Sequence, residues 1–329
     1  MKELALPWVR ALGQRRARRL RLADLAATTC VTAVAFTGIA AVVLIFVFVA
    51  REAAPLFLDG TSPAGDVLAK LFAPQVTRPG HPAAFVWQPV SGVPKLSVVP
   101  LLVGTVKVSL LGLCFAAPVA VAAALFSSQL APRWLRTWLE PAIELLAGVP
   151  SVVIGFFVLM VLATPVQHAL GLPTRLNTLI TALGVGIAIA PVIFAVAKDA
   201  LAAVPPSYRE ASLALGATRW ETARRVMLPA AAPGVLAACM LGLGRAVGET
   251  MIVLMVSGNA AIVSAALTDP TRTLSATIAA ELGEVVAGGE HFRALFFLGV
   301  LLFVITFAIN LAATSAVRRA IHRMHGAAP

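Results

Sequence analysis

The strongest constraint on the fold is a run of 23 residues, Thr28 to Ala50, that contains no charged side chain. A helix of about 20 apolar residues, each rising 1.5 Å, crosses the roughly 30 Å hydrocarbon core of a bilayer. Five further apolar stretches lie at approximately 99–126, 141–163, 178–197, 233–257 and 294–317. Hydrophobic residues make up 59% of the 329 positions and charged residues 12%, which is too apolar for a domain covered by water. The sequence therefore predicts an all-α integral membrane protein with six transmembrane helices.

The first apolar stretch is predicted to be a permanent span rather than a cleaved signal peptide. Both begin with basic residues, and several arginines precede this stretch. The apolar core of a signal peptide, however, is typically about 7 to 15 residues long. The stretch here is longer, so we expect it to stay in the protein.

The distribution of Lys and Arg predicts the orientation of these helices, because positively charged loops tend to remain in the cytoplasm. With the N-terminus inside, the cytoplasmic segments hold 17 of the 26 basic residues and the external segments hold 7. We expect both termini to be cytoplasmic, with a basic segment at 1–27, a transmembrane domain at 28–317 and a tail at 318–329. The net charge of +11 then reflects topology and suits anionic lipid, without nucleic acid as a partner.

Neither metal, disulfide nor nucleotide chemistry is indicated. Cys30, Cys114 and Cys239 lie in apolar stretches without the spacing of a redox or zinc motif. The five histidines are scattered over loops and the C-terminus, so they do not suggest a metal cage. No P-loop of the form G-x-x-x-x-G-K-[ST] occurs. We expect no cofactor, no metal and no ATPase activity in this chain, and an enzyme is the weakest hypothesis.

Two segments on the external side are expected to carry limited structure. The segment 51–98 is rich in Pro and Gly, and a short helix near Asp66 to Phe72 is expected there, without an independent core. The loop 260–291 is expected to hold a partly re-entrant helix, with Glu281 and Glu284 as solvated or interface residues. Lys107, near the outer end of the second span, either extends to the headgroups or attracts anions.

The cytoplasmic loop 198–232 carries strong helix signals. Ser207 to Glu210 and Thr218 to Glu221 fit the capping-box pattern, in which a hydroxyl and a carboxylate satisfy the first free amides of a helix. Gly216 can end the first helix in a left-handed conformation, and Pro229 is expected to stop the second. These signals predict a helix-turn-helix elbow facing the cytosol, with a solvated connector as the alternative.

The spacing in this elbow resembles the EAA motif of ABC importer permeases, E-A-A-x3-G-x9-I-x-L-P. Ser212 and Val226 stand where the motif has Ala and Ile. In that family the elbow is a coupling helix that docks into a cleft of the ATPase subunit. The residues to which the resemblance assigns this coupling are Glu210, Ala211, Gly216, Leu228 and Pro229.

The fifth apolar stretch contains two charged residues, Arg245 and Glu249, with Thr250 beside them. Each charge would cost about 2.5 to 3.5 kcal/mol at the centre of a bilayer, so both are expected to face protein or water. Four residues apart, they are predicted to share one helical face. The alternative to a translocation path is an internal ion pair that holds the helices together. Close approach of another backbone is expected at Gly242, Gly244 and Gly248.

These two side chains suit an oxyanion that still carries a proton. Arg245 offers a planar fork of donors to phosphate oxygens. The Glu249 carboxylate can accept the remaining phosphate O–H, whereas sulfate has no hydrogen to give. We therefore expect phosphate to be preferred over sulfate.

Two longer stretches, residues 244–251 and 144–155, resemble the phosphate-specific ABC transporter permeases. The resemblance extends from Trp87 to Asn310 and is closer to the PstC type than to the PstA type, because of residues 87–89 and 269–279. It implies the type I ABC importer permease fold and a permease subunit of the bacterial inner membrane. It also implies that Arg245 and Glu249 take part in phosphate passage.

The resemblance further implies a set of partners. A second phosphate permease would form a heterodimer with this chain, with two ATP-binding subunits below and a periplasmic phosphate-binding protein above. A phosphate-sensing kinase system is compatible with it. The alternatives are a permease for another oxyanion, a secondary transporter driven by an ion gradient, and a membrane subunit that reports phosphate status.

Overall fold

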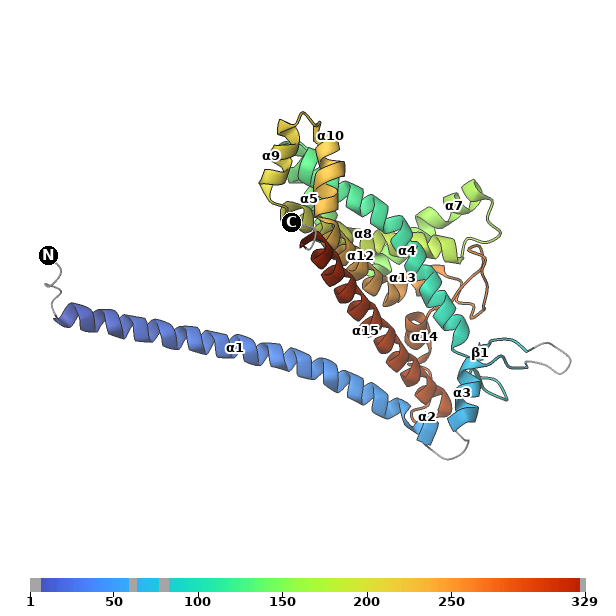
Figure 1. The fold of residues 1–329 in the computed structure, drawn as a ribbon. Helices are drawn as coiled ribbons and strands as arrows, with labels where there is room; N and C mark the ends of the chain where they lie inside the picture. Colours follow the sequence, from blue (N-terminus) through green and yellow to red (C-terminus); the bar gives the residue numbers. More distant parts are fainter. Residues whose placement is uncertain (1–6, 59–63, 77–82, 326–329) are drawn as a thin grey trace. The chain divides into compact units, whose positions relative to one another are not determined.

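The computed structural model describes residues 7–58, 64–76 and 83–325. The described chain is mostly helical, from α1 (Pro7–Ala53) to α15 (Glu290–His325), with one two-stranded hairpin. Contacts divide the chain into two units, Met1–Arg51 and Glu52–Pro329. The first unit contains nearly all of α1, and the second contains the other helices and the hairpin (Figure 1).

Helix α1 exposes apolar side chains around its circumference. None of the residues in its most apolar window is buried, and Val31, Phe36, Ile39 and Leu44 are each more than half exposed. A helix that is apolar on every face is stable where the surrounding solvent is lipid. The predicted first span agrees with the apolar segment that runs from Ala27 through α2 (Pro55–Leu58).

Four further segments of the described chain are long and apolar enough to cross a membrane. They are Val99–Leu130, Ser151–Leu170, Thr178–Ala202 and Glu290–Arg319. The remaining predicted span corresponds to α12 (Ala232–Val247), which passes the same test only together with the preceding Arg219–Ala230, at a bend of 71°. The described residues therefore hold five spans, or six when this bent pair is one span.

The third span begins later than predicted. The backbone of Val149 and Pro150 is extended and separates α5 (Arg133–Gly148) from α6 (Ser151–Phe157). The span continues through the π-helical turn η2 (Val158–Leu162) into α7 (Ala163–Leu170). A proline disfavours helical geometry in the residue before it, and this effect of Pro150 makes the predicted start at 141 wrong.

The centre of the second unit is the packing of α4 (Val99–Leu125) against α8 (Thr178–Ala202). A Cβ atom added to Gly186 would lie 3.1 Å from the carbonyl oxygen of Gly112, so the two backbones are close. Small residues at such contacts are typical of membrane helices. Asn177 caps the start of α8, because its side chain accepts a hydrogen bond from the Ile180 amide at 2.9 Å.

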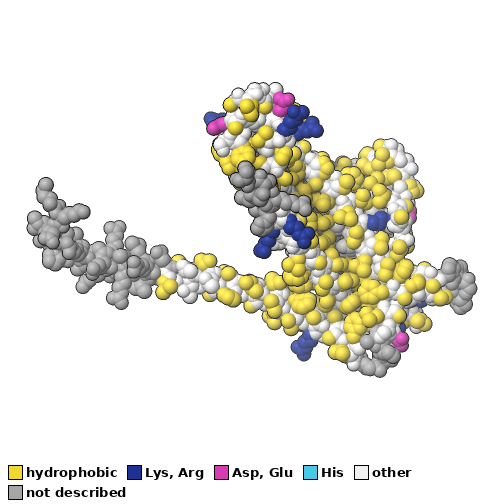
Figure 2. Space-filling model, in the orientation of Figure 1, with side chains coloured by type: hydrophobic (Ala, Val, Ile, Leu, Met, Phe, Trp, Pro, Cys, Tyr) yellow, Lys and Arg dark blue, Asp and Glu magenta, His cyan; other side chains and the backbone are white. Residues whose placement is uncertain are grey.

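The elbow lies at one end of the bundle. It comprises α9 (Pro206–Ala214), α10 (Arg219–Thr222), the π-helical turn η3 (Ala223–Met227) and α11 (Leu228–Ala230). The C-terminal part of α15 lies at the same end (Figure 1), and its Arg318 shares a pocket with Val196 of α8. Figure 2 shows apolar side chains over much of the bundle and charged side chains gathered at this end, which we call the elbow end.

The opposite end, here called the hairpin end, has its own buried cluster. Strands β1 (Trp87–Gln88) and β2 (Lys95–Leu96) are antiparallel, with Trp87 opposite Leu96. They pack with α3 (Ala64–Phe72), α14 (Leu274–Glu281) and the start of α15. The buried residues of this cluster are Val67, Leu71, Trp87, Leu96, Val98, Leu101, Leu274, Ala294, Leu295 and Leu298. The helix predicted near 66–72 is confirmed as α3, and its segment shares the cluster with later helices.

Gly104 offers a test of the packing between α4 and the segment before α14. A Cβ atom at this position would clash with the backbone carbonyl oxygen of Arg272 and lie 2.6 Å from Thr271 Oγ1. We expect Gly104→Ala to destabilise the protein by about 1–3 kcal/mol, as overpacking does, and to lower the melting temperature in detergent. Gly283→Ala is the control, since nothing lies within 4 Å of a Cβ there. Equal melting temperatures for the two variants would contradict this packing.

Candidate functional site

The predicted fifth span is broken at the charged residues. Helix α12 ends at Val247, Gly248 caps it with φ −86° and ψ −2°, and α13 (Met251–Val256) begins three residues later. Glycine has low helix propensity, which favours an end at this glycine-rich stretch. Arg245 and Glu249 therefore do not share one face of a continuous helix, and that prediction is wrong.

Arg245 and Glu249 have different surroundings. Arg245 is exposed, and the ion pairs of the described residues all join other side chains. Glu249 is 8% exposed, and its Oε1 accepts a hydrogen bond from the Ile252 amide at 3.4 Å, a long and weak bond. The alternative of an internal Arg245–Glu249 ion pair is therefore not present in this structure.

Helix α14 holds the break from its other side. Ser275 Oγ donates a hydrogen bond to the backbone carbonyl oxygen of Glu249 at 2.9 Å. Thr250 Oγ1 donates to the carbonyl oxygen of Gly248 at 3.1 Å. Gly248, Thr250 and Ser275 line a cavity of about 540 Å³ together with Ile278, Ala279, Leu282, Gly283 and Leu302. The predicted site residue Thr250 thus lines a cavity next to the break.

A tight contact occurs at one of the three glycines for which close approach of another backbone was predicted. A Cβ atom at Gly242 would lie 2.6 Å from Ile193 Cγ1 of α8, whereas nothing lies within 4 Å at Gly244. At Gly248 the nearest atom is the carbonyl oxygen of Arg245, at 3.8 Å. The close contact at Gly242 is with a side chain rather than with a backbone.

The elbow confirms one of its two predicted capping boxes. Thr218 Oγ1 accepts a hydrogen bond from the Glu221 amide at 3.2 Å, and Glu221 Oε2 accepts one from the Thr218 amide at 2.9 Å. The box predicted at Ser207 is wrong, since α9 starts at Pro206 and has no side-chain cap. Proline is favoured at the first helical position because its missing N–H would be unpaired there.

The turn of the elbow also differs in part from the prediction. Gly216 has φ +85°, so the predicted left-handed end of α9 is confirmed. Pro229 does not stop the second helix, which continues to Ala230 and ends at Ala231. The hydroxyls of Ser212 and Thr222 lie 2.9 Å apart and hold the two helices of the elbow together.

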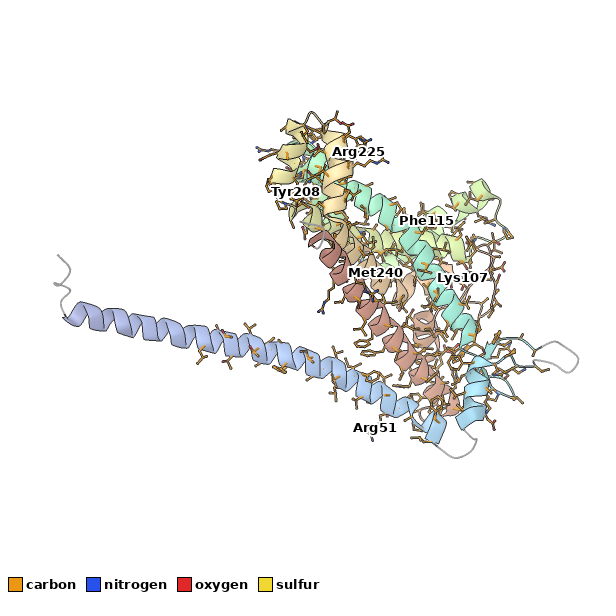
Figure 3. The ribbon with its side chains drawn as sticks, viewed as in Figure 1. Arg51, Lys107, Phe115, Tyr208, Arg225 and Met240 are labelled. Carbon is orange, nitrogen blue, oxygen red and sulfur yellow. The ribbon has the colours of Figure 1, made fainter. Side chains whose placement is uncertain are left out.

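The elbow exposes apolar side chains that the sequence predictions missed. Leu215 is 88% exposed, and Tyr208 and Trp220 are more than half exposed. Figure 3 shows Tyr208 and Arg225 on the elbow, and Lys107 on α4, away from the elbow. Large apolar residues in and between two short helices outside the spans were the available signal. Of the predicted coupling residues, Leu228 is half-buried and the others are exposed: Glu210, Ala211, Gly216 and Pro229.

Helix α5 is fixed to α8 by a half-buried carboxylate near the elbow end. Lys198 Nζ lies 3.1 Å from Glu140 Oε2, and Ser127 Oγ donates to Glu140 Oε1 at 2.9 Å. Burial raises the pKa of the Glu140 carboxyl, but the hydrogen bonds from Ser127 and Lys198, with the charge of Arg136, outweigh this effect and hold the pKa below its ordinary value. Glu140 therefore remains ionised and keeps the contact at neutral pH.

Lys107 has a structural role that neither sequence hypothesis contained. Its Nζ donates hydrogen bonds to the backbone carbonyl oxygens of Ser264 and Ala266, both at 2.8 Å. The ammonium is thus directed at the backbone of the loop before α14, rather than at the headgroups. Lys107 anchors this loop to α4.

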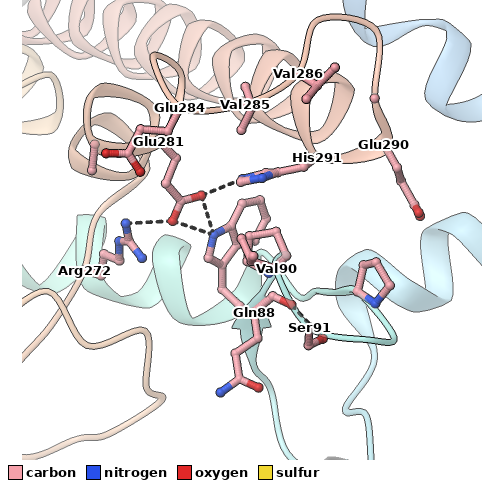
Figure 4. A pocket seen from close by; sticks show the side chains of 15 residues that line it. Gln88, Val90, Ser91, Arg272, Glu281, Glu284, Val285, Val286, Glu290 and His291 are labelled. Carbon is pink, nitrogen blue, oxygen red and sulfur yellow. Dashed lines mark hydrogen bonds and ion pairs between the residues drawn. The ribbon is translucent and has the colours of Figure 1, made fainter.

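A further pocket lies at the hairpin end (Figure 4). Glu281, the last residue of α14, lies within 2.7 Å of Arg272 Nη2 and 2.8 Å of His291 Nε2. The indole N–H of Trp87 donates to the same carboxylate at 3.0 Å. The Glu281 side chain is 16% exposed, so the expectation of a solvated residue is wrong for Glu281, while Glu284 is exposed as expected. Among the described residues, no group of three His, Cys, Asp or Glu is placed to hold a metal ion.

Comparisons with known proteins agree with this architecture. The model of the family "Binding-protein-dependent transport system inner membrane component" matches residues 116–325. The probable ABC transporter permease YqgH of Bacillus subtilis is 36% identical over 84% of this chain and 85% of that protein. The phosphate transport system permease PstC of Mesorhizobium japonicum is 39% identical over 68% and 73%.

A solved inward-facing structure of the MetNI methionine ABC transporter covers 68% of this chain and 97% of the matched chain, with a TM-score of 0.53 and 20% identity. At that identity the likeness shows the fold alone. The family match spans well over half of the chain and includes the break and the elbow. This protein therefore belongs to the family of inner membrane components of binding-protein-dependent transport systems, as a multi-pass ABC importer permease with the type I fold.

Proposed function

We propose that this permease is one subunit of an ATP-driven importer of inorganic phosphate. The observation that carries the proposal is Arg245, an exposed guanidinium near the end of α12 that forms none of the ion pairs of the described chain. A charge in a membrane helix is costly unless it meets water, protein or substrate. The relatives named as phosphate transport permeases favour phosphate as that substrate.

The chemistry of the break supports an oxyanion with one remaining proton. The guanidinium of Arg245 can bind two phosphate oxygens at once. The Glu249 carboxylate can give up its 3.4 Å bond to the Ile252 amide at little cost and accept the phosphate O–H. Thr250, at the edge of the neighbouring cavity, can add a hydroxyl contact. Sulfate would place an oxygen without hydrogen against Glu249 and be rejected.

The same proposal assigns the two ends of the bundle to the two sides of the membrane. The elbow end and both termini are cytoplasmic, and the hairpin end, with segment 51–98, is periplasmic. A second phosphate permease covers the exposed Arg245 side and forms a heterodimer. The chain itself supplies no ATPase, so two ATP-binding subunits act from below, and a phosphate-binding protein delivers substrate from above.

The elbow is the proposed contact with one ATP-binding subunit. Its apolar side chains Leu215, Tyr208 and Trp220 fit a cleft of a partner protein, because exposed apolar groups on a capped, rigid element gain free energy when they are covered. The capping box at Thr218 and the Ser212–Thr222 contact make the elbow stiff enough to transmit motion. The residues proposed for coupling are Glu210, Ala211, Gly216, Leu228 and Pro229.

The decisive test is uptake of labelled phosphate and labelled sulfate by vesicles that contain the reconstituted complex, with and without ATP. We expect ATP-dependent uptake of phosphate and little uptake of sulfate. Phosphate uptake that persists without ATP and follows an ion gradient would support a secondary transporter instead. Equal uptake of both anions would contradict the role of Glu249.

Glu249→Gln tests the selectivity directly. The amide can donate a hydrogen bond to sulfate, so we expect sulfate uptake relative to phosphate uptake to rise about 10-fold, the effect of roughly 1.4 kcal/mol. The ratio of initial uptake rates in the same vesicles measures this change. Asp66→Asn, at an exposed carboxylate outside the break, is the matched control and should keep the wild-type ratio. An unchanged ratio in Glu249→Gln would remove Glu249 from the site.

A further inference from the structure

The Glu281 carboxylate joins the segment 272–291 to the hairpin, whose Trp87 lies 194 residues earlier in the chain. Arg272 precedes α14, His291 lies in the first turn of α15 and Trp87 belongs to the hairpin, and all three contact the carboxylate that ends α14 (Figure 4). The charged side chains of this group are less than one fifth exposed. Charge-assisted hydrogen bonds in such surroundings are short and strong, so they hold these segments together.

The pocket above this carboxylate, which we call the hairpin pocket, has a volume of about 960 Å³. Its lining includes Val90, which is 91% exposed, and Val286, which is 83% exposed. Glu284 also lines it and forms none of the ion pairs of the described residues. The pocket therefore combines exposed apolar groups with an unmatched negative charge. A partner with a Lys or Arg side chain flanked by apolar residues complements this lining.

Helix α14 connects the hairpin pocket to the break in the fifth span. Its last residue, Glu281, lies at the pocket, and Ser275 in its first turn donates to the Glu249 carbonyl oxygen at 2.9 Å. The Leu274 amide donates to Thr105 Oγ1 of α4 at 3.1 Å. Eight residues of helix are about 12 Å long. A displacement of the pocket is thus transmitted by a short, hydrogen-bonded helix to the backbone of Glu249, at the break.

We propose that the hairpin pocket is the surface on which the periplasmic binding protein docks through a basic side chain with apolar neighbours, and that α14 transmits docking to the break at Glu249. The proposal rests on the proposed function, because that function places the hairpin end in the periplasm. Docking can shift the transporter between states only if its contacts differ between them. The proposal therefore requires that the contacts of the hairpin pocket with the binding protein change when the break at Glu249 rearranges.

The experiment uses the complete reconstituted transporter and titrates the phosphate-binding protein while ATP hydrolysis is measured. Glu284→Lys reverses the charge of the lining, and we expect the concentration for half-maximal stimulation to rise about 10-fold, with the stimulation at saturation retained. Asp66→Lys reverses an exposed acid outside the pocket and should leave this concentration within about 2-fold. Equal concentrations for the two variants would overturn the docking surface.

The transmission step has a separate readout. Ser275→Ala removes the bond to Glu249, so we expect the half-maximal concentration to stay at the wild-type value while the maximal stimulation falls several-fold. Ser275→Thr keeps the hydroxyl and should restore part of the stimulation. Normal maximal stimulation in Ser275→Ala would overturn the role of α14.

A photo-crosslinking amino acid in place of Val286 identifies what covers the pocket. Capture of the binding protein supports the proposal, and capture of the second permease or of lipid overturns it. Failure of the proposed function is distinguishable from these results. If phosphate is not the substrate, the phosphate-binding protein will not stimulate even the wild-type transporter. If the pocket is wrong, wild type will respond and Glu284→Lys will respond equally well.

Discussion

Arg245→Ala is expected to lower ATP-dependent phosphate uptake by about 100-fold or more. A phosphate oxyanion in a water-poor path that loses its charged partner forfeits roughly 2–5 kcal/mol, and about 1.4 kcal/mol corresponds to each factor of ten. Initial rates of labelled phosphate uptake, normalised to the amount of assembled complex in the vesicles, measure the effect. Uptake within about 3-fold of wild type would remove Arg245 from the substrate path.

The variant is informative because Arg245 contributes little to the fold. It is exposed and forms none of the ion pairs found among the described residues, so its removal leaves no buried partner unpaired. We therefore expect the melting temperature and complex assembly to match wild type. Arg245→Lys keeps the charge but lacks the planar fork and should retain part of the uptake. Arg318→Ala, at the elbow end of α15, is a control that should transport normally.

Gly216→Val is expected to abolish coupling while leaving membrane insertion intact. The residue has φ +85° and nothing lies within 4 Å of an added Cβ, so the effect comes from backbone conformation rather than from a clash. A β-branched residue resists this conformation, at a cost of about 1–3 kcal/mol. The turn between α9 and α10 would then open and displace the exposed Leu215. Binding of the ATP-binding subunit should weaken by at least about 10-fold.

Gly216→Asn is the matched control, because Asn tolerates positive φ far better than Val. Its affinity for the ATP-binding subunit should stay close to that of wild type. Copurification and a titration of the purified ATP-binding subunit measure both variants. Wild-type affinity and transport in Gly216→Val would show that the elbow is only a connector.

Features of the fold that depend on nearby residues were predictable. The apolar stretches and the capping box at Thr218 require only a window of neighbouring residues, and both are present in the structure. Hydropathy averages over such a window, so it does not register three non-helical residues at 248–250. The same limit placed the start of the third span at 141, although Pro150 carried a local signal for the break.

The candidate site was predictable in composition and not in geometry. Arg245 and Glu249 stand out in an apolar stretch, but the break between them is held by a hydrogen bond from Ser275 of α14, 26 residues after Glu249. The Glu281 carboxylate contacts Trp87, which lies 194 residues earlier in the chain. No single-sequence pattern reports such a pair. The bonds of Lys107 to loop carbonyls were missed for the same reason.

The long helix α1 has a different consequence. In its most apolar window none of the residues is buried, and it belongs to a separate unit from the rest of the chain. Burial of side chains in a core ties each position to the shape of its neighbours, whereas lipid accepts any apolar side chain. The residues of this window are therefore constrained by the length and hydrophobicity of the helix rather than by packing against a core. Within this chain, substitutions in this window that keep the helix apolar are therefore expected to leave the packing of the second unit unchanged.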